Sequence, residues 1–294
     1  GFNTLGFKIT GDRVSSFFND ELILGSFLVR FMPVILWFIF FLKIDLKKNI
    51  IPFITFFSLY FITIYLSGGR TSFFLSVVII LGLFIIIKDL RRILSYSIII
   101  LIFFIFITSY FKIGNANTFN RIFVKTYNQI SKTEININKS DTKIKKKLKK
   151  INIYSKDHEG HILLALYLFE KNKIFGIGPQ GFKDYCRKVK YAPKIGICST
   201  HPHNILIQII LELGLIGLAF YIIAAIFVLF NFFKSIVRHK FNHDYLAFYS
   251  ITLGLIINLF PFIPGGNFFN NWISIILYYN IGLYLYSYKK CILK

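Results

Sequence analysis

Seven long apolar runs alternate with polar segments along this chain. They lie at about residues 22–42, 51–66, 71–87, 93–111, 204–233, 245–263 and 273–288. Most of them approach the ~20 residues that an α-helix needs to cross a bilayer. Their apolar residues are continuous rather than alternating, which disfavours a β-barrel. The pattern predicts an all-α fold, a polytopic bundle of about seven transmembrane helices.

One long polar segment, at about residues 112–201, separates the fourth run from the fifth. The predicted segments are therefore 1–111, 112–201 and 202–294. The long segment contains a basic run at residues 142–150. That run is either a solvated helix or disordered insert, or a surface that holds anionic lipid.

A second feature of the long segment is an amphipathic pattern at residues 158–171. It predicts a helix with Leu163, Leu166 and Phe169 in its apolar stripe. The FGIGPQGF stretch at residues 175–182 follows and predicts a tight turn. This turn is either purely structural or offers backbone N–H groups to a phosphate.

The composition agrees with a membrane protein. Hydrophobic residues make up 55% of the chain, aromatic residues 19%, and the mean hydropathy is +0.61. The net charge of +22 suggests contact with anionic lipid head groups or pyrophosphate, although an AT-rich genome would also enrich Lys. No basic fold module separates from the apolar runs, so nucleic acid is not an expected partner.

The distribution of Lys and Arg predicts the orientation of the helices. Three of these residues occur in each of the short loops at 43–48, 88–92, 234–243 and 289–294. The turns at 67–70 and 264–272 together hold one, Arg70. Because positive loops stay in the cytoplasm, we expect Arg70, the long segment and the N-terminal segment to face the periplasm. Residue 1 is Gly and no signal peptide precedes the first run, so we expect an N-terminal portion to be missing.

A polar stripe enters the fifth apolar run. Asn204, Gln208 and Glu212 are spaced at i, i+4 and i+8, on one face of a helix, and His203 precedes them. Glu212 is an ionisable group deep in an apolar run, which costs about 2.5–3.5 kcal/mol on insertion scales, so it is a candidate for function. The alternative is a neutral carboxyl that is hydrogen-bonded to a neighbouring helix.

Arg70 and His203 are candidates for chemistry at the predicted outer face. The planar guanidinium of Arg70 suits phosphate oxygens, and the two preceding glycines let a head group approach the backbone. An interfacial arginine that extends toward lipid phosphate is equally compatible. His203 can accept a proton from a hydroxyl at neutral pH, or it can cap the following helix.

Two of the three cysteines flank a short segment before this helix. Cys186 and Cys198 are predicted to form a disulfide if the outer side is an oxidising periplasm. A zinc site formed by His201, His203 and the two thiols is an alternative, but its spacing matches no known zinc-ligand pattern. No metal or other cofactor is therefore expected.

Three motifs, SGGRTSFF, FGIGPQGFKDYC and THPHNILIQIILELGLIG, occur in this order around the long polar segment. In this arrangement they resemble the O-antigen ligase and O-antigen polymerase family, and the third motif is the specific one. The resemblance covers nearly the whole chain, as the C-terminal part of a longer family member. It implies a GT-C-like, all-helical membrane glycosyltransferase with helices in one long periplasmic loop. Such enzymes transfer a glycan from undecaprenyl pyrophosphate at the periplasmic face of the inner membrane, with neither a metal nor a nucleotide sugar.

The resemblance also implies roles for individual residues. His203 matches the essential loop histidine and Arg70 matches the arginine after the S-x-x motif, so these two are the expected catalytic residues. Many members have a second arginine eighteen residues before the first Gly of G-x-G, where this chain has His158. Arg121, Arg187 or Arg30 are candidates to replace it. All the substrate-binding candidates are Arg30, Arg121, His158, His161, Arg187, Asn204, Gln208 and Glu212.

The expected function is that of an O-antigen ligase with lipid A-core as the acceptor. Arg70 holds the donor pyrophosphate, and His203 positions or deprotonates the acceptor hydroxyl. The polar stripe at residues 204–212 orients His203 or lines the lipid groove. One alternative is a polymerase of the same family, which uses a growing glycan as acceptor. The other is a non-enzymatic transporter or flippase of anionic glycolipid, although no inverted repeat is evident.

Overall fold

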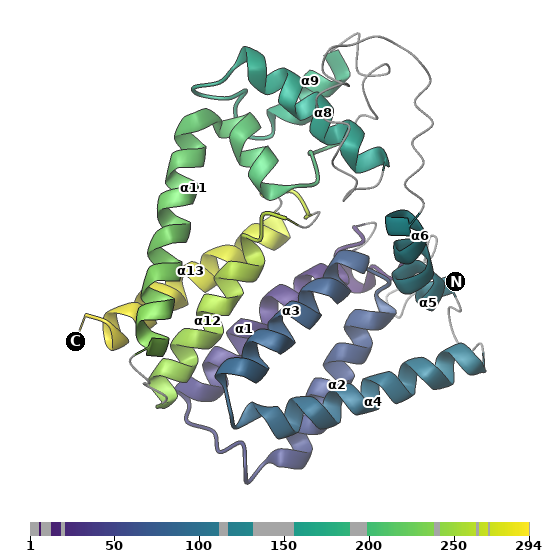
Figure 1. Cartoon of the computed structure of the whole chain (residues 1–294), viewed down its shortest axis with the longest axis vertical. Coiled ribbons are helices and arrows are strands. Elements are labelled where there is room, and N and C mark those ends of the chain that lie inside the picture. The colour runs from purple at the N-terminus through teal and green to yellow at the C-terminus, as the bar shows by residue number, and fades with distance from the viewer. Residues whose placement is uncertain are drawn as a thin grey trace. The chain divides into compact units, whose positions relative to one another are not determined.

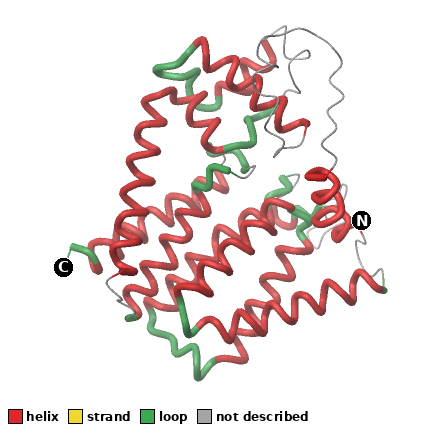
Figure 2. Tube along the Cα trace, in the orientation of Figure 1, coloured by secondary structure: helices red, strands yellow, loops and turns green. Residues whose placement is uncertain are grey.

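The computed structural model describes residues 6, 13–18, 21–111, 117–131, 156–188, 199–237, 242–262, 265–269 and 271–293. Within these ranges every regular element is a helix (Figure 2), which confirms the predicted all-helical class. The chain forms two compact units, and each is described by itself. Unit 1 comprises residues 1–124, 228–259 and 274–294, and unit 2 comprises residues 125–227 and 260–273.

Long apolar helices make up most of the described part of unit 1 (Figure 1). They are α1 (Leu24–Phe41), α2 (Ile50–Leu66), α3 (Arg70–Ile86), α4 (Leu90–Tyr110), α12 (His243–Asn258) and nearly all of α13 (Asn271–Cys291). The short elements of the unit are η1 (Ser16–Phe18), α5 (Asn117–Phe119) and η2 (Asn120–Val124). α1 packs along α12 and also contacts α2 and α3, while α4 packs against α2 and α3.

Close backbone packing holds α1, α12 and α13 together. Leu36 of α1 and Phe248 of α12 are completely buried. A Cβ on Gly254 of α12 would overlap the side-chain oxygen of Asn280 on α13 and would lie 2.7 Å from the Cβ of Pro33 on α1. Small residues allow membrane helices to approach in this way. Gly254 therefore lies at a point where all three helices meet.

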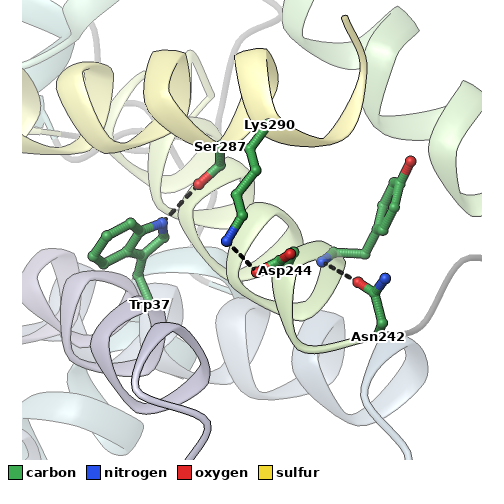
Figure 3. Close-up of polar contacts among 6 residues, drawn as sticks. Trp37, Asn242, Asp244, Ser287 and Lys290 are labelled. Carbon is green, nitrogen blue, oxygen red and sulfur yellow. Dashed lines mark hydrogen bonds and ion pairs between the residues drawn. The ribbon is translucent and has the colours of Figure 1, made fainter. Parts of the chain in front are cut away.

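Polar contacts fix one end of the same three helices (Figure 3). The indole Nε1–H of Trp37 on α1 donates to the Ser287 hydroxyl of α13 at 2.7 Å. The Lys290 ammonium of α13 contacts the Asp244 carboxylate of α12, also at 2.7 Å. The Asn242 side chain accepts the Tyr245 backbone N–H at 3.1 Å and so caps the N-terminus of α12. These contacts fix the register of α13 against both neighbours.

Unit 2 is built around a small apolar core. Its helices are α6 (Lys125–Ser131), α8 (Lys156–Lys171), α9 (Gly181–Lys188) and α11 (Ile205–Val237), the last of which continues into unit 1 after Phe227. The core residues are Leu164, Ala165, Leu168, Phe182, Cys186 and Leu211. They come from α8, α9 and the first turns of α11, so this core holds the motif-bearing segments together.

The predicted amphipathic helix at 158–171 is confirmed as α8, but the most deeply buried face of this helix is not its predicted apolar stripe. Leu163, Leu166 and Phe169 are only partly buried. The buried face is formed by His161, Leu164, Ala165 and Leu168. Apolar residues occupy both faces of this helix, so hydrophobicity alone did not show which face meets α9 and α11.

Most predicted spans correspond to helices whose ends differ by a few residues. The largest difference is at α12, which ends at Asn258 rather than at residue 263. Pro261 follows closely, and the residue before a proline is disfavoured in the helical conformation. The predicted break in α11 is confirmed, because Gly214 has φ 67° and ψ −162° inside the helix.

Among the described helices, three are long and apolar enough to cross a membrane, namely α1, α4 and α11. α2 and α3 are apolar but have 17 residues each. These lengths support a multi-pass membrane protein. The count of about seven spans and the division into membrane and loop segments at 111 and 201 stay predictions.

Candidate functional site

The polar stripe of α11 makes direct contacts with two loops of unit 2. The Glu212 carboxylate is completely buried and accepts the backbone N–H groups of Gln180 at 3.0 Å and Phe182 at 3.3 Å. The Gln208 amide donates to Glu212 at 3.1 Å and to the Asn267 side chain at 2.7 Å. The stripe therefore connects α11 to the loop before α9 and to the turn before α13.

The other contacts of the stripe extend this pattern. The Gln208 side-chain oxygen accepts the backbone N–H of Phe268 at 2.9 Å. The Asn204 side chain donates to the Pro261 carbonyl at 2.8 Å and accepts the Ile207 N–H at 3.0 Å, which caps the first turn of α11. These side chains thus orient the surrounding backbone, while a role in orienting His203 or in lining a lipid groove stays a prediction.

The glycine-rich loop lies directly on the break in α11. Ile177 and Gly178 donate their N–H groups to the carbonyls of Leu211 and Glu212, each at 3.0 Å. A Cβ on Gly214 would overlap the Ile174 carbonyl oxygen, and a Cβ on Gly176 would lie 2.5 Å from the Glu212 carbonyl carbon. Both glycines have positive φ, so no other residue fits here without strain.

This packing decides between the two interpretations of the turn at 175–182. Two of its amides bind the Glu212 carboxylate, and two others bind α11 carbonyls. These four donors are therefore engaged within the protein, which favours the structural interpretation over a phosphate-binding turn. The turn acts as a clamp that fixes α9 and α11 relative to each other.

Four histidine rings gather in unit 2. His158 and His161 lie one turn apart on α8, while His201 and His203 precede α11. The ring centroids of His201 and His203 are 4.0 Å apart, and those of His158 and His161 are each 5.1 Å from His203. The structure thus brings His203 together with two predicted residues, His158 and His161, and adds His201. We refer to these four side chains as the histidine cluster.

His203 adopts a strained, left-handed backbone conformation. Its φ is 56°, in the left-handed region that costs a residue other than glycine on the order of 1–3 kcal/mol. The carbonyl of His203 accepts the Gly265 N–H at 2.9 Å, and its ring Nε2 lies 3.0 Å from the Ser199 hydroxyl. The fold therefore holds His203 in an unfavourable conformation, which is common at functional sites.

The environment of His201 and His203 keeps these two rings neutral. Burial lowers the pKa of His203 to about 3, and the neighbouring His201, His158 and His161 contribute to the shift. Burial also lowers the pKa of His201 to about 4. Both rings are uncharged at neutral pH, and a neutral imidazole can accept a proton. Among the described residues, no group of three or more His, Cys, Asp or Glu is arranged to hold a metal ion.

Cys186 lies 1% exposed in the core of unit 2 and is disulfide-bonded. Its predicted partner, Cys198, lies outside the described residues. The bond attaches α9 to another part of the chain. The side chain of Arg187, which follows in α9, is also outside the described part.

The remaining predicted cations belong to unit 1. Arg70 is the first residue of α3, and Arg121 lies in η2. Burial, followed by the nearby charges of Arg121 and Arg70, lowers the pKa of Arg13 to about 10. Arg70 and Arg121 therefore share a cationic cluster with Arg13, which we call the arginine cluster.

Arg30 has a different environment. It lies in the interior of α1, is 2% exposed, and donates hydrogen bonds to the carbonyl and the hydroxyl of Ser26, one turn earlier in the same helix. Its partners are thus in its own helix.

Together these features define an all-helical membrane protein that carries a buried histidine cluster in one unit and an arginine cluster in the other. A family model described as O-antigen ligase matches residues 161–222, about a fifth of the chain. This match supports the O-antigen ligase and polymerase family and confirms the predicted resemblance. The matched segment contains most of α8, the glycine-rich loop, α9 and the kinked start of α11. Searches of the curated proteins and of the solved structures found no match.

Two residues that the structure places at these sites, Arg13 and Asn267, were not predicted from the sequence. Arg13 lies in a polar segment without any periodicity, so its proximity to Arg70 had no signal in the sequence. Asn267 lies in the turn after α12, and the only property that could have indicated a contact was its polar amide side chain. His201 was considered only as a zinc ligand, although its spacing from His203 could have indicated a ring contact.

Proposed function

We propose that this protein is a membrane glycosyltransferase that moves a glycan from undecaprenyl pyrophosphate to the hydroxyl of an acceptor, with lipid A-core as that acceptor. The observation that carries the proposal is the O-antigen ligase match over residues 161–222. This segment contains His203 in its strained conformation and the polar stripe that holds the surrounding loops. The enzyme lies in the inner membrane, with its site at the periplasmic face.

The reaction is a substitution at the anomeric carbon. The acceptor oxygen forms a new bond to that carbon while the bond from the carbon to the phosphate oxygen breaks. Undecaprenyl pyrophosphate leaves with the electron pair of the broken bond, and the arginine at position 70 stabilises its charge. The proton of the acceptor hydroxyl passes to His203, which is neutral at the outset.

The low pKa of His203 has a consequence for this step. A ring with a pKa of about 3 is a weak base, so it does not deprotonate a hydroxyl in the resting enzyme. A nearby anion favours the imidazolium form and raises that pKa. An anionic group of a substrate that binds beside His203 would therefore make this ring a stronger base.

The test is glycan transfer in membranes that contain His203→Ala or Arg70→Gln at wild-type expression. We expect each change to lower the transfer rate at least 100-fold, in the range of a lost general base or of a lost charge-stabilising group. His243→Ala and Arg92→Gln are matched controls, because both residues are exposed and lie outside the two clusters. Transfer at the wild-type rate by His203→Ala would remove this residue from the mechanism.

The alternative is a polymerase of the same family. The glycan that accumulates in a strain without the protein distinguishes a polymerase from a ligase. In a strain that lacks the protein, free long glycan that is not attached to lipid A-core indicates a ligase. Single repeat units on lipid A-core indicate a polymerase. A transporter would instead leave undecaprenyl-linked glycan on the cytoplasmic side.

A further inference from the structure

The loop between α8 and α9 carries two large apolar side chains on its surface. Phe175 is 76% exposed and Ile174 is 59% exposed. Lys171 and Lys173, which are also exposed, directly precede them along the chain. Single exposed apolar residues need no explanation, whereas adjacent ones with a polar rim indicate a surface that binds a partner. We refer to residues 171–175 as the apolar tip.

Hydrogen bonds attach the apolar tip to the backbone of α11, directly after the break in that helix. The Leu215 N–H donates to the Lys173 carbonyl at 2.8 Å. The Ile216 N–H donates to the Ile174 carbonyl at 3.4 Å. Backbone groups that are already bound can enter an apolar environment without losing a partner. Leu215 and Ile216 are themselves 49% and 43% exposed, so the tip and the start of the exposed part of α11 lie next to each other.

The length of α11 indicates where these residues lie. From Leu215 to Val237 the helix has 23 residues, so at 1.5 Å per residue this part is about 34 Å long. The hydrocarbon core of a bilayer is about 30 Å thick. Most of the apolar side chains in this part are exposed, for example Phe220 at 72%. A span of this length has its ends at the two membrane surfaces, so we expect the tip, which is attached at its start, at one of them.

We propose that the apolar tip is an interfacial anchor, through which unit 2 binds the surface of a bilayer that contains anionic lipid. Phe175 and Ile174 enter the boundary between head groups and acyl chains, while the ammonium groups of Lys171 and Lys173 contact lipid phosphates. The anchor is independent of the proposed function, because it requires only that α11 spans the bilayer.

The residues beside the apolar pair favour a lipid surface over a protein partner. Lysine is depleted in protein–protein interfaces, whereas lysines next to Phe and Leu are typical of segments that lie on membranes. Residues 170–175 contain two lysines and one acid, Glu170, so the tip carries net positive charge. The Lys171 ammonium lies 4.7 Å from the centre of the Tyr167 ring, which restrains this cation beside the tip.

The experiment is photocrosslinking of the full chain in nanodiscs with equal amounts of phosphatidylcholine and phosphatidylglycerol. The photoreactive residue p-benzoylphenylalanine replaces Phe175, and intact mass identifies the products. We expect the mass of one chain plus one phospholipid. Phe220 of α11 is the positive control, and Tyr127, which is 71% exposed in the polar helix α6, is the negative control. Burial of a Phe-sized ring favours the lipid by about tenfold or more, so the adduct yield at 175 should exceed that at 127 at least about tenfold.

The same products identify a different occupant. A product with the mass of two chains as the main species would show that a second copy covers the tip, and it would overturn the proposal. The replacement is repeated at Ile174, so that the test does not depend on the folding of one variant. A lipid-adduct yield no higher than that of Tyr127 at both 174 and 175 would also overturn the proposal.

A second arm tests the lysines. Each lysine near an anionic surface is worth about fivefold, so phosphatidylglycerol should be enriched at least about fivefold over phosphatidylcholine among the adducts at 175. Combined Lys171→Gln and Lys173→Gln should remove this enrichment, whereas Lys88→Gln, an exposed lysine outside unit 2, should keep it. Equal yields of the two lipids with both lysines present would refute the contact with anionic head groups. Neither readout requires glycan transfer, so a chain that gives lipid adducts but transfers no glycan would sink only the proposed function.

Discussion

Replacement of Glu212 by alanine should loosen the glycine-rich loop without unfolding the protein. The carboxylate accepts the N–H groups of Gln180 and Phe182, and both donors lose their acceptor in the variant. Gln208 also loses a partner but keeps Asn267 and Phe268. The loss of stability should therefore concentrate at residues 180–182, because Glu212 binds these residues to α11.

The lost hydrogen bonds give the expected size of the local destabilisation. The Phe182 amide is buried, so its loss of an acceptor costs about 1–3 kcal/mol, while the Gln180 amide belongs to an exposed residue and can bind water instead. The lower bound of about 1 kcal/mol corresponds to about a fivefold increase in the open population, since 1.36 kcal/mol is tenfold. Glu212→Gln retains one accepting oxygen and should lose about half as much.

The assay is amide hydrogen exchange of the purified protein in detergent, measured by mass spectrometry with residue resolution in the loop. The amides of Gln180 and Phe182 should exchange at least about fivefold faster in Glu212→Ala. The amides of Ile177 and Gly178 should change less, because their acceptors are backbone carbonyls of α11. Glu170→Ala is the control, since it removes an exposed glutamate from the same unit. Wild-type exchange at 180 and 182 in Glu212→Ala would refute the reasoning.

Three further predictions concern packing and protonation. Gly214→Ala should destabilise unit 2 by at least about 1–3 kcal/mol, because φ is 67° and a Cβ would meet a carbonyl, and limited proteolysis of unit 2 should detect it. Gly254→Ala should lower the unfolding temperature, and addition of Asn280→Ala should restore part of the loss, because it removes the overlapping oxygen. The pKa values of His201 and His203 are lowered to about 4 and about 3, below the unfolded value of about 6.5, so protonation favours the unfolded state. Stability should be level above about pH 7 and fall below about pH 6.5 by up to about 1.4 kcal/mol per pH unit per ring, while a double His→Gln variant should lose this slope.

Much of the fold could be predicted because the membrane imposes long apolar helices. α2 was placed within one residue at its start, and the break in α11 followed from its glycines. The buried face of α8 could not be predicted, because both faces of the helix carry leucines. The contact that decides between them is made by Phe182, which lies in another helix. The end of α12 was predicted too late because continued hydrophobicity outweighed the signal of Pro261.

The site was predictable only in part, for a similar reason. His158 and His161 are one helical turn apart, so their shared face could be read from spacing, but their approach to His203 depends on how α8 packs. Glu212 was a candidate because a carboxyl in an apolar helix is costly, and its partners turned out to be backbone amides. Arg13 could not be predicted as part of a site, because a single arginine in a polar segment is common and only its neighbours in the folded chain distinguish it.

The contacts of α11 explain how a buried carboxyl can serve a histidine that it does not touch. Glu212 binds the Gln208 amide, which in turn holds Asn267 and the backbone of Phe268 in the turn before α13. The same turn supplies the Gly265 N–H that binds the His203 carbonyl. His203 keeps its left-handed backbone only while this turn stays in place, because isolated residues avoid that conformation. We therefore infer that the polar stripe supports His203, and its tolerance of a buried carboxyl follows from the backbone groups that it binds.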